Sequence, residues 1–448
     1  MRTRLSAAPV VLGLCAVLIG VNGVLAAPPA ATFTSPVRLG FDLGDDWEPS
    51  VAADAEGHVY ALWTHYVGFE GGATGEVDPS CPECPSPHMV LQVSDDGGAT
   101  WGEPHALAPS DERQDDPQIV VDPGDGVTVY TAYMEGDKSS MFVARSENFG
   151  ETFEPVLVED IQRGLDKIAL AARDGQVYLV YHSQQKIWAS VSHDEGKSWT
   201  VSQPVHNTNS KFGVSLPSGA AIDENGVAYF AWNGANRPGQ AKGTKTLYVT
   251  RTADGGATWT TSIVDRSAEA PPCECGGWDY WGSQMAIGVD DEERVYVLWN
   301  ATSVSEGPHR MRFARSTNGG QTWSTPVDVS QAPAGSNHLF PALVAIGDGD
   351  VRIAWQDDRN GFDAGGEDPT ARWNTYYRYS TDGGMTWSDE TQLSAYVEGY
   401  DYKATDGYLQ PYGDYFELDI DKDGKTVALW GEGNSYVGPG NVWYAAEL

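Results

Sequence analysis

The sequence predicts an all-β fold, a seven-bladed β-propeller, and a repeated pattern is the main reason. The pattern is Ser or Thr, any residue, Asp or Asn, any residue, Gly, any residue, Thr or Ser, then an aromatic residue. Its six copies occupy Ser94–Trp101, Ser146–Phe153, Ser192–Trp199, Thr252–Trp259, Ser316–Trp323 and Ser380–Trp387. Repeats at intervals of roughly 50–65 residues are typical of units too small to bury their own hydrophobic face.

Each repeat is predicted to contain four antiparallel strands. The first is an apolar run such as Pro49–Asp54 or Pro117–Asp122. The second ends in an aromatic residue in all six repeats, at Val59–Trp63, Val129–Tyr133, Val177–Tyr181, Ala228–Trp232, Val295–Trp299 and Val351–Trp355. The third runs into the eight-residue pattern, as in Met89–Val93, and the fourth follows it. Apolar runs separated by Gly, Asp and Asn turns indicate strands, and radially repeated four-stranded sheets are propeller blades.

The eight-residue pattern itself is predicted to be a hairpin turn with a structural role. Its Asp or Asn side chain can accept hydrogen bonds from nearby backbone amides, and Gly98 and its counterparts adopt conformations that other residues resist. The aromatic residue at the end has the size to pack between neighbouring sheets.

A seventh blade is predicted from the C-terminal sequence. Three strands fit there, at Phe416–Ile420, Thr426–Trp430 and Asn441–Ala445, but the chain ends at Leu448 before a fourth. We expect Ser35–Leu39, which resembles the fourth strands of other repeats, to complete this blade and close the ring. Closure of this kind removes exposed sheet edges. A six-bladed ring is the alternative.

The rest of the composition places limits on location and partners. Met1–Ala27 has two arginines followed by an apolar stretch and is predicted to be a secretion signal, so residues 28–448 would form one domain that is secreted, periplasmic or at the cell surface. The formal net charge is −35. Binding to nucleic acid requires a basic surface, so nucleic acid is not expected as a partner, and neither is membrane insertion.

Four cysteines lie in two close pairs, Cys81 with Cys84 and Cys273 with Cys275. In an exported protein these are disulfide candidates, either within or between the pairs. A thiolate metal site and free thiols are the alternatives, and the sequence does not give the pairing.

The six repeats resemble the Asp box, or BNR repeat, of secreted bacterial sialidase-like propellers, and the resemblance spans nearly all of residues 28–448. It implies that the Asp-box turns lie on one face and that function lies on the opposite face. Exo-sialidases have an Arg-Ile-Pro motif in the first blade, which supplies an arginine for a carboxylate-binding triad. Here the corresponding segment is Trp47-Glu48-Pro49, so the resemblance to true exo-sialidases is not close.

The first candidate site on the functional face is acidic. Asp45, Asp46 and Glu48 precede one blade, and Asp115 and Asp116 precede the next. Paired carboxylates serve glycoside hydrolysis, so Asp46 and Glu48 are predicted catalytic residues. The same oxygens suit Ca²⁺, although no cofactor is required, and a solvated acidic surface is the third reading. Trp47 is a candidate substrate contact.

Further candidates come from later blades. Asp358 is a third predicted catalytic carboxylate, and Arg359 can bind a substrate carboxylate or form internal salt bridges. In sialidases a tyrosine paired with an acid is the nucleophile, and the resemblance points to Tyr412 or Tyr415 for that role. The predicted substrate contacts elsewhere are Tyr408, Asp414, Trp278 and Trp281.

These features predict a sialidase-like propeller that hydrolyses extracellular glycan or polysaccharide with carboxylates at the mouth of the channel. A non-catalytic propeller that binds glycan or a protein partner is the alternative. A polysaccharide lyase with a Tyr or His base and Arg359 is the third hypothesis.

Overall fold

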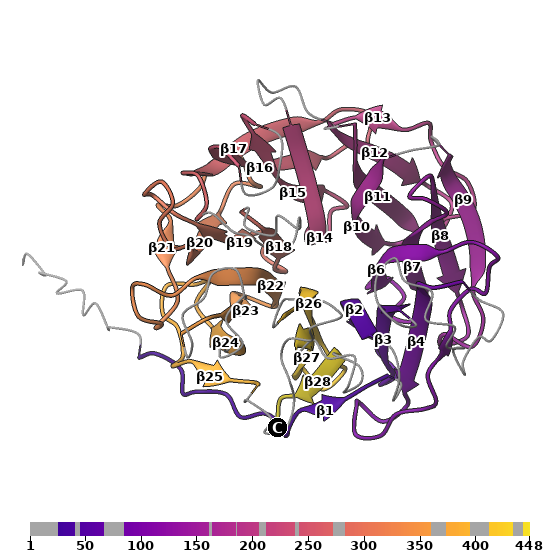
Figure 1. Ribbon diagram of the computed structural model, residues 1–448, viewed down its shortest axis with the longest axis horizontal. Helices are drawn as coiled ribbons and strands as arrows, with labels where there is room; N and C mark the ends of the chain where they lie inside the picture. Colours follow the sequence, from indigo (N-terminus) through magenta and orange to yellow (C-terminus); the bar gives the residue numbers. More distant parts are fainter. Residues whose placement is uncertain are drawn as a thin grey trace, which may run out of the picture.

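The computed structural model describes residues 26–40, 45–66, 85–160, 164–184, 186–205, 212–237, 242–271, 283–359, 373–394, 412–432 and 442–448, with the backbone alone at residues 45, 212–218, 412–414 and 432. These residues form seven four-stranded sheets arranged around a central axis (Figure 1). They contain no α-helix, and hence no helix that could cross a membrane. The predicted all-β, seven-bladed propeller is confirmed, and the six-bladed alternative is wrong.

The strands of each blade follow chain order from the axis outward, except that the N-terminal β1 is the outermost strand of blade 7. Blade 1 consists of β2 (Asp45–Ala53), β3 (Val59–Tyr66), β4 (His88–Ser94) and β5 (His105–Ala106). Blade 2 consists of β6 (Gln114–Val121), β7 (Val129–Glu135), β8 (Ser140–Ser146) and β9 (Glu154–Asp160). Blade 3 consists of β10 (Leu165–Arg173), β11 (Gln176–Ser183), β12 (Lys186–Ser192) and β13 (Gln203–Pro204). Blade 4 consists of β14 (Phe212–Ile222), β15 (Ala228–Ala235), β16 (Lys245–Thr252) and β17 (Thr260–Ser267). Blade 5 consists of β18 (Met285–Val289), β19 (Val295–Ala301), β20 (Arg310–Ser316) and β21 (Val327–Asp328). Blade 6 consists of β22 (His338–Ile346), β23 (Asp350–Asp357), β24 (Asn374–Ser380) and β25 (Thr391–Gln392). Blade 7 consists of β26 (Tyr412–Ile420), β27 (Thr426–Glu432), β28 (Val442–Ala446) and β1 (Val37–Arg38).

The ring is closed by the N-terminal strand, as predicted. In Figure 1 β1 lies beside β28, and Val37 pairs with Tyr444 in antiparallel register. The amide of Leu448 donates to the carbonyl of Thr32 at 2.9 Å, which extends this pairing to the end of the chain. Leu39, just after β1, is buried in the core between blades 7 and 1.

The Asp-box turns have the predicted hydrogen bonds. In blade 1 Asp96 Oδ1 accepts from the amide of Thr100 at 2.7 Å, and Asp96 Oδ2 accepts from the Thr100 hydroxyl at 2.7 Å. Gly98 has a φ of 86°, and a Cβ atom there would collide with the hydroxyl of Tyr444 in blade 7. The ring of Trp101 packs edge-on against Tyr444, with centroids 4.9 Å apart. The turn therefore both ends the hairpin and fits blade 1 against its neighbour.

Two carboxylates of β26 connect blade 7 to blade 1. Glu417 Oε2 accepts from the Ser50 hydroxyl at 2.5 Å and from the amide of Val51 at 3.1 Å. Two residues further, Asp419 Oδ2 accepts from the amide of Ala53 at 2.8 Å. The inner edge of β2 has no sheet partner, so these side chains satisfy backbone donors that would otherwise lack one.

Asp419 makes stability depend on pH. Burial raises its pKa to about 6, despite hydrogen bonds from the amides of Ala53 and Ile420 that act in the opposite direction. A carboxyl whose pKa is higher in the folded chain than in the unfolded chain stabilises the fold when protonated, and this contribution is lost as pH rises through about 6. We expect Asp419→Asn to remove up to about 3 kcal/mol of this pH dependence. Thermal melting of the wild-type protein and of this variant between about pH 4 and pH 7 tests this, and parallel curves for the two would contradict it.

Candidate active site at the mouth of the propeller

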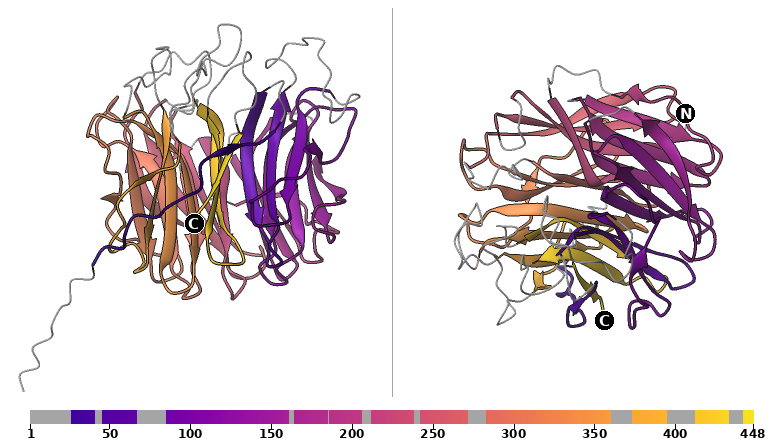
Figure 2. Two further views of the ribbon diagram at one scale, coloured as in Figure 1. Left: turned by 90° about the horizontal axis from the view of Figure 1, so that it is seen from below. Right: turned by 45° about the vertical axis from the view of Figure 1, so that its right-hand side comes forward.

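The inner strands of six blades carry a β-bulge at the same level of the ring. The register shifts between Trp47 and Ser50 in blade 1 and between Asp115 and Gln118 in blade 2. Similar shifts occur in β10, β14, β22 and β26, between Asp166/Ile168, Ser215/Ala220, Leu339/Ala342 and Tyr412/Phe416. Figure 2 shows the strands spanning the thickness of the ring, so these bulges lie together near one face. The Asp-box turns lie at the other face, because they follow the third strand of each blade.

Five non-glycine residues at or beside the bulges have positive φ values. Glu48, Asp116, Lys167, Phe340 and Tyr415 have φ values of 58°, 52°, 48°, 48° and 70°. A non-glycine residue in this left-handed region is uncommon and costs about 1 kcal/mol or more, and such residues are often found at functional sites. Three of the five precede proline, which lacks the amide that a regular strand would use in the ladder.

Asp116 is the centre of the resulting cluster. It is fully buried, and its Oδ1 accepts a hydrogen bond of 2.8 Å from the Tyr415 hydroxyl of blade 7. Lys167 Nζ of blade 3 lies 3.3 Å from the same oxygen, and Lys138 Nζ lies 3.5 Å from Oδ2. Lys167 also lies over the ring of Tyr415, 4.5 Å from its centroid. One carboxylate therefore joins blades 2, 3 and 7.

Asp116 is held in its ionised form. Burial alone would raise its pKa, but the charges of Lys167 and Lys138, with side-chain hydrogen bonds from Glu48 and Tyr415, outweigh burial and lower the pKa. Burial would likewise lower the pKa of Lys138, but Asp116 and Asp166 raise it, so this lysine stays protonated.

Glu48 of blade 1 completes the cluster. Its Oε2 accepts from the Thr64 hydroxyl at 2.8 Å and from the amide of Asp116 at 3.0 Å. Glu48 of blade 1 is therefore joined to Asp116 of blade 2 through the Asp116 amide.

A second pair in blade 1 involves Asp46. Its Oδ1 lies 2.6 Å from Nδ1 of His65, and both side chains are buried. The ring of His88 packs edge-on against that of His65, with centroids 5.6 Å apart. Asp46 thus orients a histidine rather than joining the carboxyl pair of Glu48 and Asp116.

The predicted residues of blade 6 form a further group. Asp358 is buried and accepts hydrogen bonds from the amide and side chain of Asn337 at 2.7 and 2.9 Å. Burial, with the nearby charge of Asp357, outweighs these bonds and raises the pKa of Asp358 to about 6. Arg359 binds Asp357 at 2.6 Å and Glu390 at 2.5 Å, and it lies 3.6 Å over the ring of Tyr376. The donors of Arg359 are therefore engaged in internal salt bridges, which was one of the two roles that the sequence allowed for this residue.

The remaining predicted residues divide into three groups. Trp47 is buried, with 2% of its surface exposed, so it packs within the core and offers no face to a sugar. Tyr412 and Asp414 begin β26, but only their backbone is described. Tyr408, Trp278, Trp281 and the disulfide candidates Cys81, Cys84, Cys273 and Cys275 lie outside the described residues, so these predictions are untested.

Lys138 and Lys167 belong to the cluster but were not predicted. The sequence does contain a signal for Lys167. It stands in the inner strand of blade 3 at the level that Glu48-Pro49 and Asp116-Pro117 occupy in blades 1 and 2, just ahead of an apolar run. Lys138 lies in the turn between β7 and β8, and no sequence pattern marks it.

No group of three or more His, Cys, Asp or Glu side chains in the described part of the chain could hold a metal ion. The acidic residues Asp46, Glu48 and Asp116 instead use their oxygens on His65, Thr64 and the lysines. The predicted Ca²⁺ site remains untested by these contacts.

Comparisons with known proteins agree with the repeats and the architecture. Residues 79–231 match the model of the BNR repeat-like domain, and residues 378–389 match the BNR/Asp-box repeat. No curated protein sequence matches the chain significantly. Among solved structures, a protein of unknown function from Dyadobacter fermentans is 14% identical with a TM-score of 0.53, over 94% of this chain and 99% of that one.

Sialidases also appear among the similar structures. An intramolecular trans-sialidase from Ruminococcus gnavus is 14% identical with a TM-score of 0.44, over 93% of this chain and 94% of that one. A sialidase from Streptococcus pneumoniae is 12% identical with a TM-score of 0.46, over 93% of this chain and 70% of that one. The family-model matches and the seven four-stranded sheets together show that the chain is a seven-bladed β-propeller with BNR repeats.

Proposed function

We propose that this propeller hydrolyses glycosidic bonds of an extracellular carbohydrate at the cluster formed by Glu48, Asp116 and Tyr415. The observation that carries the proposal is the pairing of the Tyr415 hydroxyl with the buried carboxylate of Asp116, 2.8 Å apart, beside the carboxyl group of Glu48, which accepts from the Asp116 amide at 3.0 Å. Cleavage of a glycoside needs a proton donor beside a nucleophile, and neighbouring carboxyl and tyrosine side chains can divide these roles.

The roles follow from the contacts. Glu48 is the proton donor to the leaving oxygen. Tyr415, one of the two tyrosines to which the resemblance pointed, is the nucleophile and is oriented by Asp116. As the Tyr415 hydroxyl attacks, its proton passes to Asp116, and Lys167, which lies over the Tyr415 ring, stabilises the negative charge that develops on the phenol oxygen.

The charges of the site favour a neutral sugar over sialic acid. Lys167 is paired with Asp116, Lys138 lies between Asp116 and Asp166, and Arg113 is paired with Asp115 at 2.8 Å. Arg359 is likewise paired with Asp357. A substrate carboxylate would have to displace an internal one at each of these cations.

Incubation of the purified protein with a broad glycan panel, followed by mass spectrometry, tests the proposal. We expect products that have gained water, and we expect Glu48→Gln and Tyr415→Phe to lower kcat by at least about 10²–10³-fold while substrate binding persists. Asp137→Asn, an exposed change near Lys138, is the control and should retain activity. Unsaturated products would indicate a lyase instead, and wild-type turnover unchanged in both variants would reject this site.

A non-catalytic glycan- or protein-binding propeller is the second candidate. The observation in its favour is that Asp116 is held ionised by four partners, and a carboxylate with a lowered pKa is a weak base. Saturable binding to a glycan of the panel without any product, lost in Tyr415→Phe, would support this function.

A further inference from the structure

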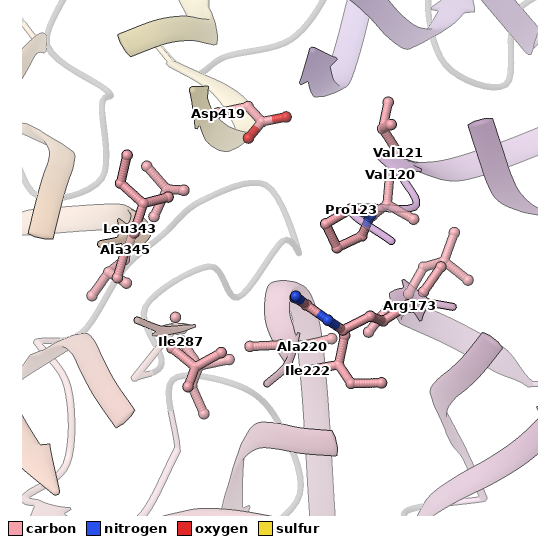
Figure 3. A pocket seen from close by; sticks show the side chains of 18 of the residues that line it. Val120, Val121, Pro123, Arg173, Ala220, Ile222, Ile287, Leu343, Ala345 and Asp419 are labelled. Carbon is pink, nitrogen blue, oxygen red and sulfur yellow. The ribbon is translucent and has the colours of Figure 1, made fainter. Parts of the chain in front are cut away.

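A cavity of about 380 Å³ lies on the axis of the ring, at the end that carries the Asp-box turns. All seven inner strands line it, through residues in the second half of each strand (Figure 3). Every lining residue belongs to the part of the chain that the structure describes. Its volume lies within the range of cavities that bind small organic molecules.

The cavity is separate from the cluster around Asp116. Gln118 and Glu417 line its inner end, two residues along their strands from Asp116 and Tyr415. Gln118 donates a hydrogen bond to Glu417, which also accepts from Ser50, so a polar layer lies between the two sites. A ligand in the cavity would therefore not touch the proposed catalytic residues.

The walls of the cavity are mostly aliphatic. Figure 3 shows Ala220, Ile222, Ile287, Leu343 and Ala345 around it, contributed by blades 4, 5 and 6. Such walls favour an apolar group, because its transfer from water is favourable in proportion to the area buried.

Arg173 is the cation of the cavity, and its hydrogen-bonding capacity is largely unused. Its guanidinium group projects from β10 into the open space (Figure 3). The nearest carboxylate oxygens belong to Glu224 at 3.8 Å and Asp174 at 4.0 Å, beyond hydrogen-bond distance. Both of these acids are exposed, with 58% and 71% of their side chains accessible. A guanidinium presents five N–H donors in a planar fork that matches a carboxylate.

Asp419 lies on the wall contributed by blade 7, across the cavity from this guanidinium (Figure 3). Its two oxygens each accept one backbone hydrogen bond at 2.8 Å, from Ala53 and Ile420, and each keeps a further acceptor site. Two other acids that line the cavity are engaged within the protein: Asp223 accepts from Asn225, Val227 and Tyr229, and Asp290 accepts from Arg294, Tyr296 and Gly349.

We propose that the axial cavity binds a small zwitterion, an amino carboxylate with an apolar side chain. The carboxylate pairs with Arg173, the ammonium group faces Asp419, and the apolar side chain packs against the aliphatic walls. A ligand with both charges matches the two opposite walls, whereas a simple anion would meet the acidic side of the cavity and a simple cation would meet Arg173.

Three related probes test the assignment of both charges. Phenylalanine carries both groups, 3-phenylpropionate lacks the ammonium group, and 2-phenylethylamine lacks the carboxylate. Calorimetric titration at about pH 7.5 keeps Asp419 ionised, since its pKa is about 6. We expect saturable binding of phenylalanine and at least tenfold weaker binding of the other two.

Variants assign each charge to its residue. Arg173→Gln should remove the preference for phenylalanine over 2-phenylethylamine. Asp419→Asn should remove the preference for phenylalanine over 3-phenylpropionate. Ala220→Phe should fill the cavity and abolish binding of all three. Arg266→Gln is the matched control, because Arg266 is exposed and donates to Thr246 at the outside of blade 4. Thermal melting shows which variants remain folded.

The outcomes are distinct. No saturable phenylalanine binding at millimolar concentration, equal affinity for the three probes, or unchanged binding in Arg173→Gln and Ala220→Phe would each overturn the proposal. Glu48→Gln should bind phenylalanine as the wild type does. A failure of phenylalanine to bind would therefore not bear on the proposed hydrolase. A failure of the glycan panel to give products would not bear on the proposed ligand of the cavity.

Discussion

Asp116→Asn should lower the free energy of unfolding by about 3–5 kcal/mol. The substitution preserves shape but removes the negative charge that faces Lys167, whose side chain is only 8% exposed. An unpaired ammonium group at this depth is far more costly than the loss of an exposed salt bridge. Lys138 contributes less to the effect, because 35% of its side chain is exposed.

Urea denaturation monitored by tryptophan fluorescence measures this change. Asp137→Asn is the matched control: Asp137 is exposed in the turn that carries Lys138, and its replacement should shift stability by less than about 0.5 kcal/mol. A loss below about 1 kcal/mol in Asp116→Asn would show that the two lysines can do without this counterion.

Removal of the N-terminal strand should have a comparable or larger effect. A chain that starts at residue 41 lacks β1, the edge-on contact between Phe33 and Tyr377 at 4.9 Å, and the buried side chain of Leu39. We expect a loss of about 4 kcal/mol or more from the buried apolar groups alone. The edge of β28 would also be exposed, and exposed edges associate with other strands.

The control for this truncation is a chain that starts at residue 31, which keeps every one of these contacts. Size-exclusion chromatography and thermal melting compare the two proteins. If the shorter chain remained monomeric and melted within a few degrees of the control, the ring would not depend on closure by its N-terminus.

Most of the fold could be predicted from the sequence, because each blade repeats one local pattern. The turn at Ser94–Trp101 specifies its own hydrogen bonds, and an apolar run that ends in Trp63 or Trp355 specifies a buried second strand. The closure by Ser35–Leu39 followed from a missing strand at one end of the chain and a surplus one at the other.

The site was less predictable, because it depends on contacts between blades. Glu48 was predicted from its carboxyl group, but its partner Asp116 is 68 residues away and its orientation comes from a bulge. Tyr415 and Asp116 are separated by 299 residues. Local patterns do not report such distances, nor do they show that Arg359 would pair with Glu390 from the next hairpin.

The shared bulge has a consequence for how such a site could change over time. Glu48, Asp116, Lys167, Phe340 and Tyr415 are an acid, an acid, a base, an apolar ring and a phenol, yet all have the same backbone conformation at the same level. The scaffold thus fixes where a side chain points and leaves its chemistry open. One blade can exchange its residue by a single substitution without altering its neighbours' backbone, so new specificities can arise one blade at a time.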